Sequence, residues 1–299
     1  MTYRSVIAIA LLTPVSTTTA QERIVEHVNS LRTEYQYVHT DTLDTTIGPL
    51  EIGETDAHVL LLSGTFWLND RWQVFGTVPY VRKRHHGAEA HDPVRDFDQY
   101  MAPDLRVIDD GRYHGGLQDF HGGVQYLAID GAFSLSPFVS FGIPLSDYPT
   151  YGSAAIGKQL RELPVGVSME FSPYFSDWLF QADLAYVLSE KKVGVNLNYW
   201  LAYASASYYL SPRFAPRVFV AARQAPNGLK YPDDFPDYDN ANGYYHDVTL
   251  KHSYVNAGVG LDYVVNDRYE IAATYFRTVD PDNVAETDYA FTVALTRLF

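Results

Sequence analysis

Polar and ionisable side chains occupy every second position in many segments of this 299-residue chain. Between residues 32 and 36, Arg32, Glu34 and Gln36 alternate with Thr33 and Tyr35. Residues two apart in an extended chain lie on one face, so such segments predict strands with one charged, hydrogen-bonding face. The residues that we expect to line a wet interior are Arg32, Glu34, Gln36, Asp119, His121, Gln181, Asp183, Asn196, Asn198, Arg223, Asp262 and Glu270.

A nucleophile paired with a base would give such a face a catalytic use. A Ser and a His on one strand face need a spacing of two, and no His in the chain has a Ser two residues away. His252 and Ser253 are adjacent, so within a strand they would point to opposite faces. A pair formed between strands stays open, but we expect no enzyme and name no catalytic residue.

Histidines close to acids raise the question of a metal site. Asp119 and His121 share a face, and such a couple can act as a base or help to bind a metal; we interpret it as ordinary polarity of the interior. Residues 82–92, RKRHHGAEAHD, contain three His. Without a second cluster at ligand spacing, they favour a solvated loop, so we expect no metal and no cofactor. The acidic residues 231–240 either bind cations that bridge lipopolysaccharide phosphates or form a solubilising lid.

Strands must position these side chains, and an alternation with a period of two predicts twelve of them. Single-chain bacterial outer-membrane barrels have an even number of strands. The expected strands are 30–38, 57–68, 71–81, 116–127, 131–143, 162–171, 178–188, 193–210, 217–224, 254–264, 268–278 and 289–299. Connections after even strands are short and most of those after odd strands are longer, as in barrels with short periplasmic turns and long extracellular loops.

The bulk properties agree with an exported barrel. Residues 1–20 have a basic residue, a short apolar run and a small-residue end, the layout of a cleaved secretory signal, which leaves residues 21–299 as one barrel domain. No other stretch has the ~20 apolar residues of a membrane helix. The chain has no Cys, and its net charge of −14 argues against nucleic acid as a partner.

Aromatic residues beside the short turns predict a girdle of aromatic side chains around the barrel, at the edge of its apolar band. Its expected members are Trp67, Trp72, Trp178, Tyr263, Tyr269 and Phe299. Tyr289 and Phe299 share a face and lie roughly 25 Å apart along a tilted strand, close to the height of that band. We therefore predict a closed, transmembrane up-and-down antiparallel β-barrel in the outer membrane of a Gram-negative bacterium, in contact with lipid and lipopolysaccharide. A terminal Phe resembles the signal that the barrel-assembly machinery reads in the last strand.

Polar groups inside a membrane span are tolerated against water or against one another. The inner row therefore lines a pore or closes into a network that plugs a narrow barrel, and we favour the pore. Loop aromatics such as Tyr113, Phe235, Tyr244 and Tyr245 would stack on aromatic or sugar-like solutes at its mouth. We expect a channel or transporter for passive uptake of small molecules. The alternatives are a lipid-modifying barrel enzyme and a structural or adhesive barrel.

One part of the chain resembles a known family. The G-x-x-D strand opening Gly116–Asp119, the turn GIPLSDYP with Pro144, and VPYV before a long loop are similar to the outer-membrane transporter-like family of the meta-pathway of phenol degradation. Ser146 stands where that family has Gly. The resemblance covers about the middle half of the chain and implies a barrel that takes up hydrophobic or aromatic compounds.

Overall fold

The structure, a computed structural model, describes residues 28–87, 90–97, 102–235 and 241–299. The signal-peptide prediction for residues 1–20 lies outside this part of the chain. Its β-strands are β1 (Ser30–Leu43), β2 (Leu50–Trp67), β3 (Trp72–His86), β4 (His114–Leu117), β5 (Asp119–Tyr126), β6 (Phe133–Pro144), β7 (Glu162–Phe171), β8 (Trp178–Ser189), β9 (Tyr199–Tyr208), β10 (Phe214–Gln224), β11 (Ser253–Asn266), β12 (Tyr269–Asp282) and β13 (Tyr289–Leu298).

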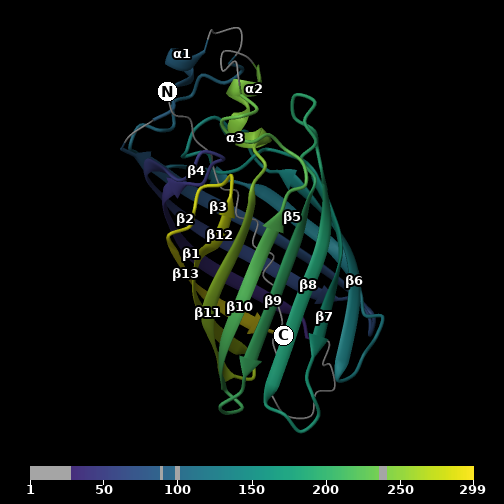
Figure 1. The fold of residues 1–299 in the computed structure, drawn as a ribbon. Coiled ribbons are helices and arrows are strands. Elements are labelled where there is room, and N and C mark those ends of the chain that lie inside the picture. Colours follow the sequence, from purple (N-terminus) through teal and green to yellow (C-terminus); the bar gives the residue numbers. More distant parts are fainter. Residues whose placement is uncertain (1–27, 88–89, 98–101, 236–240) are drawn as a thin grey trace.

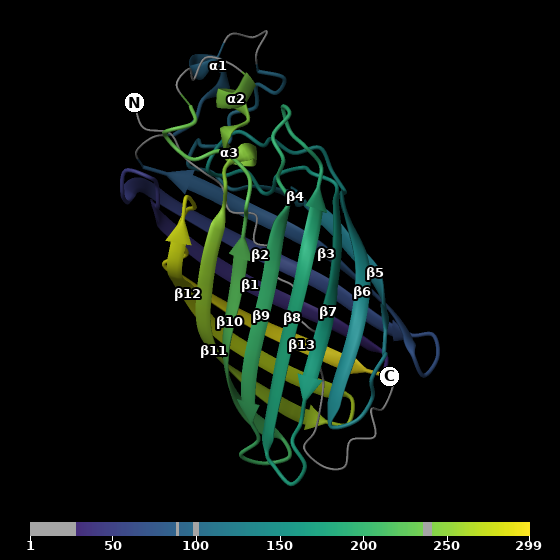
Figure 2. The same ribbon diagram turned by 45° about the vertical axis from the view of Figure 1, so that its right-hand side comes forward.

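The strands form one closed antiparallel barrel (Figures 1 and 2). Consecutive strands pair with one another, except that β5 pairs with β3 in place of β4; β13 pairs with β1, and the additional pairing of β2 with β3 completes the ring. β4 and β5 both pair with β3 and are separated by Gln118 alone, so they form one interrupted wall strand. The wall therefore has twelve strands, which confirms the expected fold class.

The two faces of the wall differ as the alternation predicts. Along β13, Phe291, Val293 and Leu295 are exposed, whereas Thr292 and Ala294 between them are buried. The other strands repeat this pattern, with large apolar side chains exposed on the outside. Examples of these outer residues are Leu60, Leu62, Val139, Phe141, Val165, Leu184, Val218, Val220, Val259 and Leu261. An outer surface of this kind suits lipid, and the polar groups are left to the interior.

Aromatic pairs mark the rim with the short turns. Trp72 contacts Tyr126 with ring centroids 4.9 Å apart, and Trp178 contacts Tyr208 at 5.0 Å. The ring of Phe299 lies 5.9 Å from that of Phe66. The expected girdle members Trp72, Trp178, Tyr263, Tyr269 and Phe299 are all exposed on the outer face.

The prediction for Trp67 was wrong. Trp67 pairs with Gln73 and is two residues from the buried Thr65, so it lies on the inner face of the barrel. Its closeness to the short turn suggested an outer position. In a strand, however, residues an even number of positions apart lie on the same face, and Trp67 is two positions from the inward Thr65.

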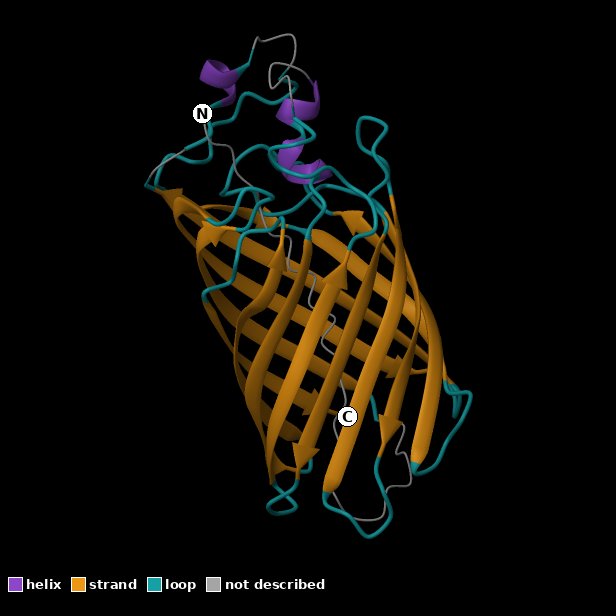
Figure 3. Cartoon of the chain, viewed as in Figure 1, coloured by secondary structure: helices purple, strands orange, loops and turns teal. Residues whose placement is uncertain are grey.

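The opposite rim carries the long connections and three short helices, α1 (Pro93–Asp96), α2 (Ala241–Tyr244) and α3 (His246–Thr249), which lie beyond the end of the barrel (Figure 3). α1 begins where Pro93 follows Asp92, whose side chain caps the amides of Val94 and Arg95. Within the described residues, no helix is long and apolar enough to span a membrane.

Candidate functional site: the lumen and its loop cover

The inner face carries most of the polar residues that the sequence singled out. Arg32 lies beside Glu34, with Nη2 2.6 Å from Oε2, and Gln181 donates from Nε2 to Glu170 at 3.1 Å. The inward strand positions of the predicted set are Arg32, Glu34, Gln36, Asp119, His121, Gln181, Asp183, Arg223, Asp262 and Glu270.

Asn196 and Asn198 do not belong to this set. Both precede β9 in the connection after β8, so the strand predicted for them was wrong at that end. Asn198 accepts a hydrogen bond from the backbone N–H of Ser189 at 2.9 Å, and Asn196 accepts one from the N–H of Asn198 at 3.0 Å. Both amides thus hold the turn instead of lining the interior, a role for which Asn is favoured.

Aromatic rings also face the interior, between the polar groups. Phe75 and Phe138 make an edge contact at 6.3 Å, and Phe219 contacts Phe276 at 6.2 Å and Tyr203 at 6.0 Å. A Cβ added at the inward Gly258 would meet the Phe219 ring at 2.5 Å. This ring therefore lies close to the wall, over a residue that has no side chain.

Nearer the long loops, a cation and an aromatic ring meet on the inner wall. The Arg223 guanidinium lies 3.6 Å from the centroid of the Tyr199 ring, and the Tyr199 hydroxyl donates to Glu162 at 3.0 Å. A guanidinium over a tyrosine face gains from the quadrupole of the ring. Arg223 was expected among the lining residues; Tyr199 was grouped with the apolar residues of its segment, and Glu162 was placed on a polar face but not among the lining residues.

The Asp119–His121 couple is divided between two contacts. The Tyr148 hydroxyl, in the connection between β6 and β7, donates to the Asp119 carboxylate and accepts from the backbone N–H of Gln159 at 3.0 Å. His121 instead lies against Gly142 on the neighbouring strand, where an added Cβ would meet its ring at 2.9 Å. Asp119 therefore anchors a loop.

Three connections meet over the long-loop rim, and we call them the cover: the described residues of 87–113, residues 145–161 and the described residues of 225–252. Its centre is aromatic. Tyr151 stacks on Tyr244 at 5.4 Å, and Phe97 meets both rings edge-on at 5.2 and 5.6 Å. Tyr244 is buried, so the expectation that it would offer a free face to solutes at the mouth was wrong. These rings hold the cover together.

Buried ionisable groups hold the cover as well. The Asp109 carboxylate accepts from His91 Nδ1 at 2.9 Å and from the backbone N–H groups of Ser153 and Ala154 at 2.9 and 2.8 Å. Burial alone would raise the pKa of Asp109, but the hydrogen bond and charge of His91 hold it well below its usual range. Burial opposes protonation of His91, yet the hydrogen bond to Asp109 and the charge of Asp247 raise its pKa.

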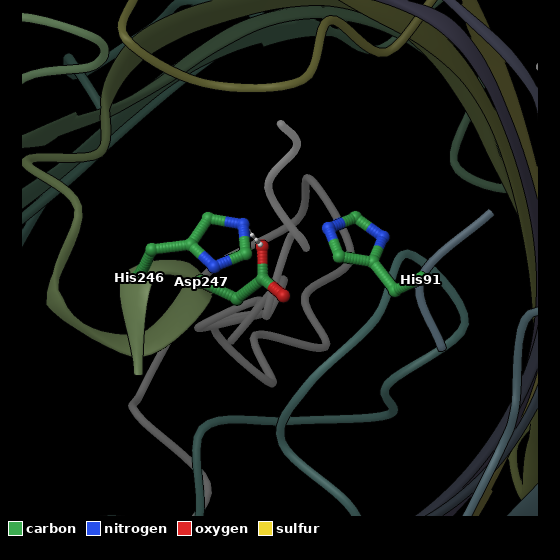
Figure 4. Close-up of side chains that lie close together, drawn as sticks. All are labelled: His91, His246 and Asp247. Atoms are coloured by element: carbon green, nitrogen blue, oxygen red, sulfur yellow. Dashed lines mark ion pairs between the residues drawn. The ribbon is translucent and has the colours of Figure 1, made fainter. Parts of the chain in front are cut away.

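This arrangement corrects the prediction of a solvated loop at residues 82–92. Residues up to His86 continue β3, and His85 is buried with Nδ1 2.9 Å from the Thr55 hydroxyl. His91 is buried beside His246 and Asp247 of α3, so one of the three His does have acidic and imidazole neighbours (Figure 4). The second cluster lies 155 residues further along the chain, beyond the reach of any spacing rule.

The acidic stretch contributes apolar contacts to the cover. Tyr231 and Phe235 are buried and pack with Leu250. The carboxylates of Asp233 and Asp234 lie on the outside of this contact, and residues 236–240 are outside the described part of the chain.

The fold is shared with solved structures of outer-membrane proteins, of which we describe two. An outer-membrane channel from Pseudomonas putida F1 superposes with a TM-score of 0.69 at 11% identity, covering 95% of this chain and 100% of the other. The NanC porin superposes with a TM-score of 0.50 at 9% identity, covering 89% and 98%. No protein-family model matches the sequence, and no curated protein sequence is similar to it. The resemblance to the phenol-pathway family therefore stays a prediction.

Proposed function

We propose that this protein is an outer-membrane channel for the passive passage of small molecules. One observation carries the proposal: a closed ring of strands exposes apolar side chains on its outside and turns charged and hydrogen-bonding ones inward. Such groups are stable within a membrane span where they meet water or one another. The two structural neighbours are named as a channel and a porin, which supports the same conclusion.

Hydrophobic or aromatic compounds are the proposed solutes. The support lies on the inner wall, where Phe75, Phe138, Phe219, Phe276 and Tyr203 place rings between the polar groups. Aromatic faces at this spacing would give a planar solute successive stacking contacts. The polar groups between the rings would keep the path wet, so that each contact is weak enough to release the solute.

The remaining parts of the proposal concern the surroundings. The long-loop rim would face the outside of the cell, where Arg82 and Arg84, both over the ring of Tyr113 on the outer wall, suit lipopolysaccharide phosphates. The C-terminal strand, ending at Phe299, would be read by the barrel-assembly machinery. In this proposal the chain catalyses no reaction.

Solute flux into liposomes tests the channel, with two neighbouring residues as a matched pair. Ala221 lies on the inner face of β10, and Val220 is exposed on its outer face. Ala221→Trp should reduce the swelling rate in an aromatic amino acid or a small sugar at least twofold, whereas Val220→Trp should leave it unchanged. Equal rates in the two variants, or no flux with the wild type, would refute the channel. Release of fatty acid from the liposomes would favour the enzyme alternative.

A further inference from the structure

Three potential metal ligands meet in the cover, and two of them come from a different loop than the third. His91 follows β3, whereas His246 and Asp247 open α3 (Figure 4). One ligand atom of each lies within 4.8 Å of the others. The imidazoles are nearly parallel, with centroids 5.3 Å apart and an angle of 19° between their planes. His246 Nε2 is 3.1 Å from Asp247 Oδ1.

The far side of each ligand is already held by another group. His91 Nδ1 bonds to Asp109 at 2.9 Å, and His246 Nδ1 bonds to the carbonyl oxygen of Gly243 at 2.8 Å. These acceptors place a proton on each Nδ1 atom, so in the neutral form of each ring it is Nε2 that carries the lone pair. Asp247 Oδ2 accepts from the backbone N–H of Gly152 at 2.9 Å, which leaves Oδ1 for another partner. A carboxylate or carbonyl behind the imidazole is the usual support of a metal-binding histidine.

Two of the three ligands turn an unpartnered polar atom toward the centre of the cluster. His91, His246 and Asp247 are at most 3% exposed. His91 Nε2 and Asp247 Oδ1 are buried without a hydrogen-bond partner. Buried polar atoms of this kind need a partner. A cation shared by the three ligands would give both of these atoms a partner.

The donor set selects the class of cation. Two imidazole nitrogens with one carboxylate oxygen suit a divalent first-row transition metal such as Zn²⁺, while Ca²⁺ and Mg²⁺ prefer oxygen ligands alone. Lys83, which is buried nearby, interacts with the charges of both Asp109 and Asp247. The positive charge of this ammonium group weakens the binding of any cation that is held by charge alone, so it favours a metal ion that forms strong bonds to nitrogen.

We propose that His91 Nε2, His246 Nε2 and Asp247 Oδ1 form a binding site for Zn²⁺ or a similar transition-metal ion, with water as a further ligand. Asp109 acts as a positioning residue behind His91. The ion would join the connection after β3 to the connection before β11, and Gly152 would tie the connection between β6 and β7 to the same site. The site would thus fix the cover over the barrel. It does not depend on the proposed transport function.

Calorimetric titration of Zn²⁺ into the full-length protein, purified in detergent and stripped with a chelator, tests the site. One ion per chain should bind to the wild type. His91→Gln and Asp247→Asn should each weaken binding at least tenfold, and Asp109→Asn should weaken it by about tenfold through the orientation of His91. The matched control is His86→Gln, because His86 lies on the same segment but is exposed and pairs with Glu54; it should bind as the wild type does.

A second measurement avoids any dependence on variant folding. Cu²⁺ bound to the wild type should give an electron paramagnetic resonance spectrum with hyperfine splitting from two imidazole nitrogens. Absence of Zn²⁺ binding in the wild type, unchanged binding in His91→Gln, or a spectrum without nitrogen splitting would each overturn the proposal. The contact of His246 with Asp247 would then be an ion pair alone. Heat-modified migration in gels would show which variants retain a folded barrel.

Discussion

Asp109 illustrates how one residue joins parts of the cover that lie far apart in the sequence. Its carboxylate receives hydrogen bonds from His91, Ser153 and Ala154, so replacing it with Ala would leave several buried donors without an acceptor. Loss of one partner from a buried charged network costs about 3–5 kcal/mol. We expect Asp109→Ala to lower the opening free energy of residues 152–155 by about that amount, measured by amide hydrogen exchange.

The neighbouring acid provides the control for this experiment. Asp110 is exposed and pairs with His114 at 2.7 Å near the surface. Exposed ion pairs contribute about 0–1 kcal/mol, so Asp110→Ala should leave the exchange of the same amides nearly unchanged. If both substitutions had equal effects, Asp109 would not be the centre of the network.

His252 makes the cover sensitive to acid. Burial, followed by the charges of Lys158, Arg223, His246 and Lys83, holds its pKa well below the ordinary value. The unfolded histidine binds more protons than the folded one between the folded pKa and about 6.5, so stability falls as the pH drops below about 6.5. The slope approaches 1.4 kcal/mol per pH unit for one group.

Hydrogen exchange of the cover at several pH values measures this effect. His252→Gln should lack the loss of stability between about pH 6.5 and the folded pKa. The raised pKa of His91 acts in the opposite direction, adding stability at low pH that disappears as the pH rises through that pKa. Because His91 is present in both proteins, the difference between wild type and variant isolates His252. Parallel pH profiles would contradict the prediction.

At the level of the strand, the same charge should destabilise the barrel much more on the outer face of β7 than on its inner face. Val165 is exposed on the outer face, whereas Ser168 faces inward and pairs across the strands with Asp183. Val165→Arg should lower the free energy of unfolding in lipid by about 2–4 kcal/mol if it lies near the bilayer centre. Ser168→Arg should cost less than about 1 kcal/mol because Asp183 can pair with it. Denaturant titration in liposomes compares the two variants.

At the level of the loop, Tyr148 fastens the connection between β6 and β7 to the barrel wall. Its hydroxyl joins Asp119 to the backbone of Gln159. Tyr148→Phe should release this attachment at a cost of about 1–3 kcal/mol and increase the open-state fluctuations in single-channel recordings. Tyr174→Phe, at an exposed position on the short-turn rim, is the matched control. Identical recordings from both variants would refute the role of the attachment.

How much the sequence could predict also differs between strand and loop. Strand faces follow from a period of two, so β7 begins and ends at the predicted residues and Arg223 lies inside as expected. Trp67 was misplaced because its nearness to a turn outweighed that same period. The site of His91 and Asp247 could not be predicted, since its contacts join residues of separate connections and no periodicity links them.

For the molecule as a whole, the last residue should influence assembly more than stability. The Phe299 ring contacts Phe66 at the rim and is more than half exposed. Deleting Phe299 should cost about 0.5–1.5 kcal/mol for the lost ring pair and a similar amount for its backbone hydrogen bond to Asn29, but it should slow insertion into liposomes that contain the assembly machinery. Phe299→Trp should restore the rate. An equal slowing in liposomes without the machinery would argue against recognition of this residue.

The seam between β1 and β13 carries a consequence for connectivity. The backbone N–H of Phe299 donates to the carbonyl of Asn29 at 3.0 Å, so the residues at this seam are neighbours in space. A peptide linker from Phe299 to Asn29, with new termini opened between Asn69 and Asp70, would preserve every strand pairing of the barrel. Such a circular permutant would keep the closed barrel but would no longer have Phe299 as its last residue. It would therefore separate the contribution of Phe299 to barrel closure from its recognition as a terminal residue by the assembly machinery.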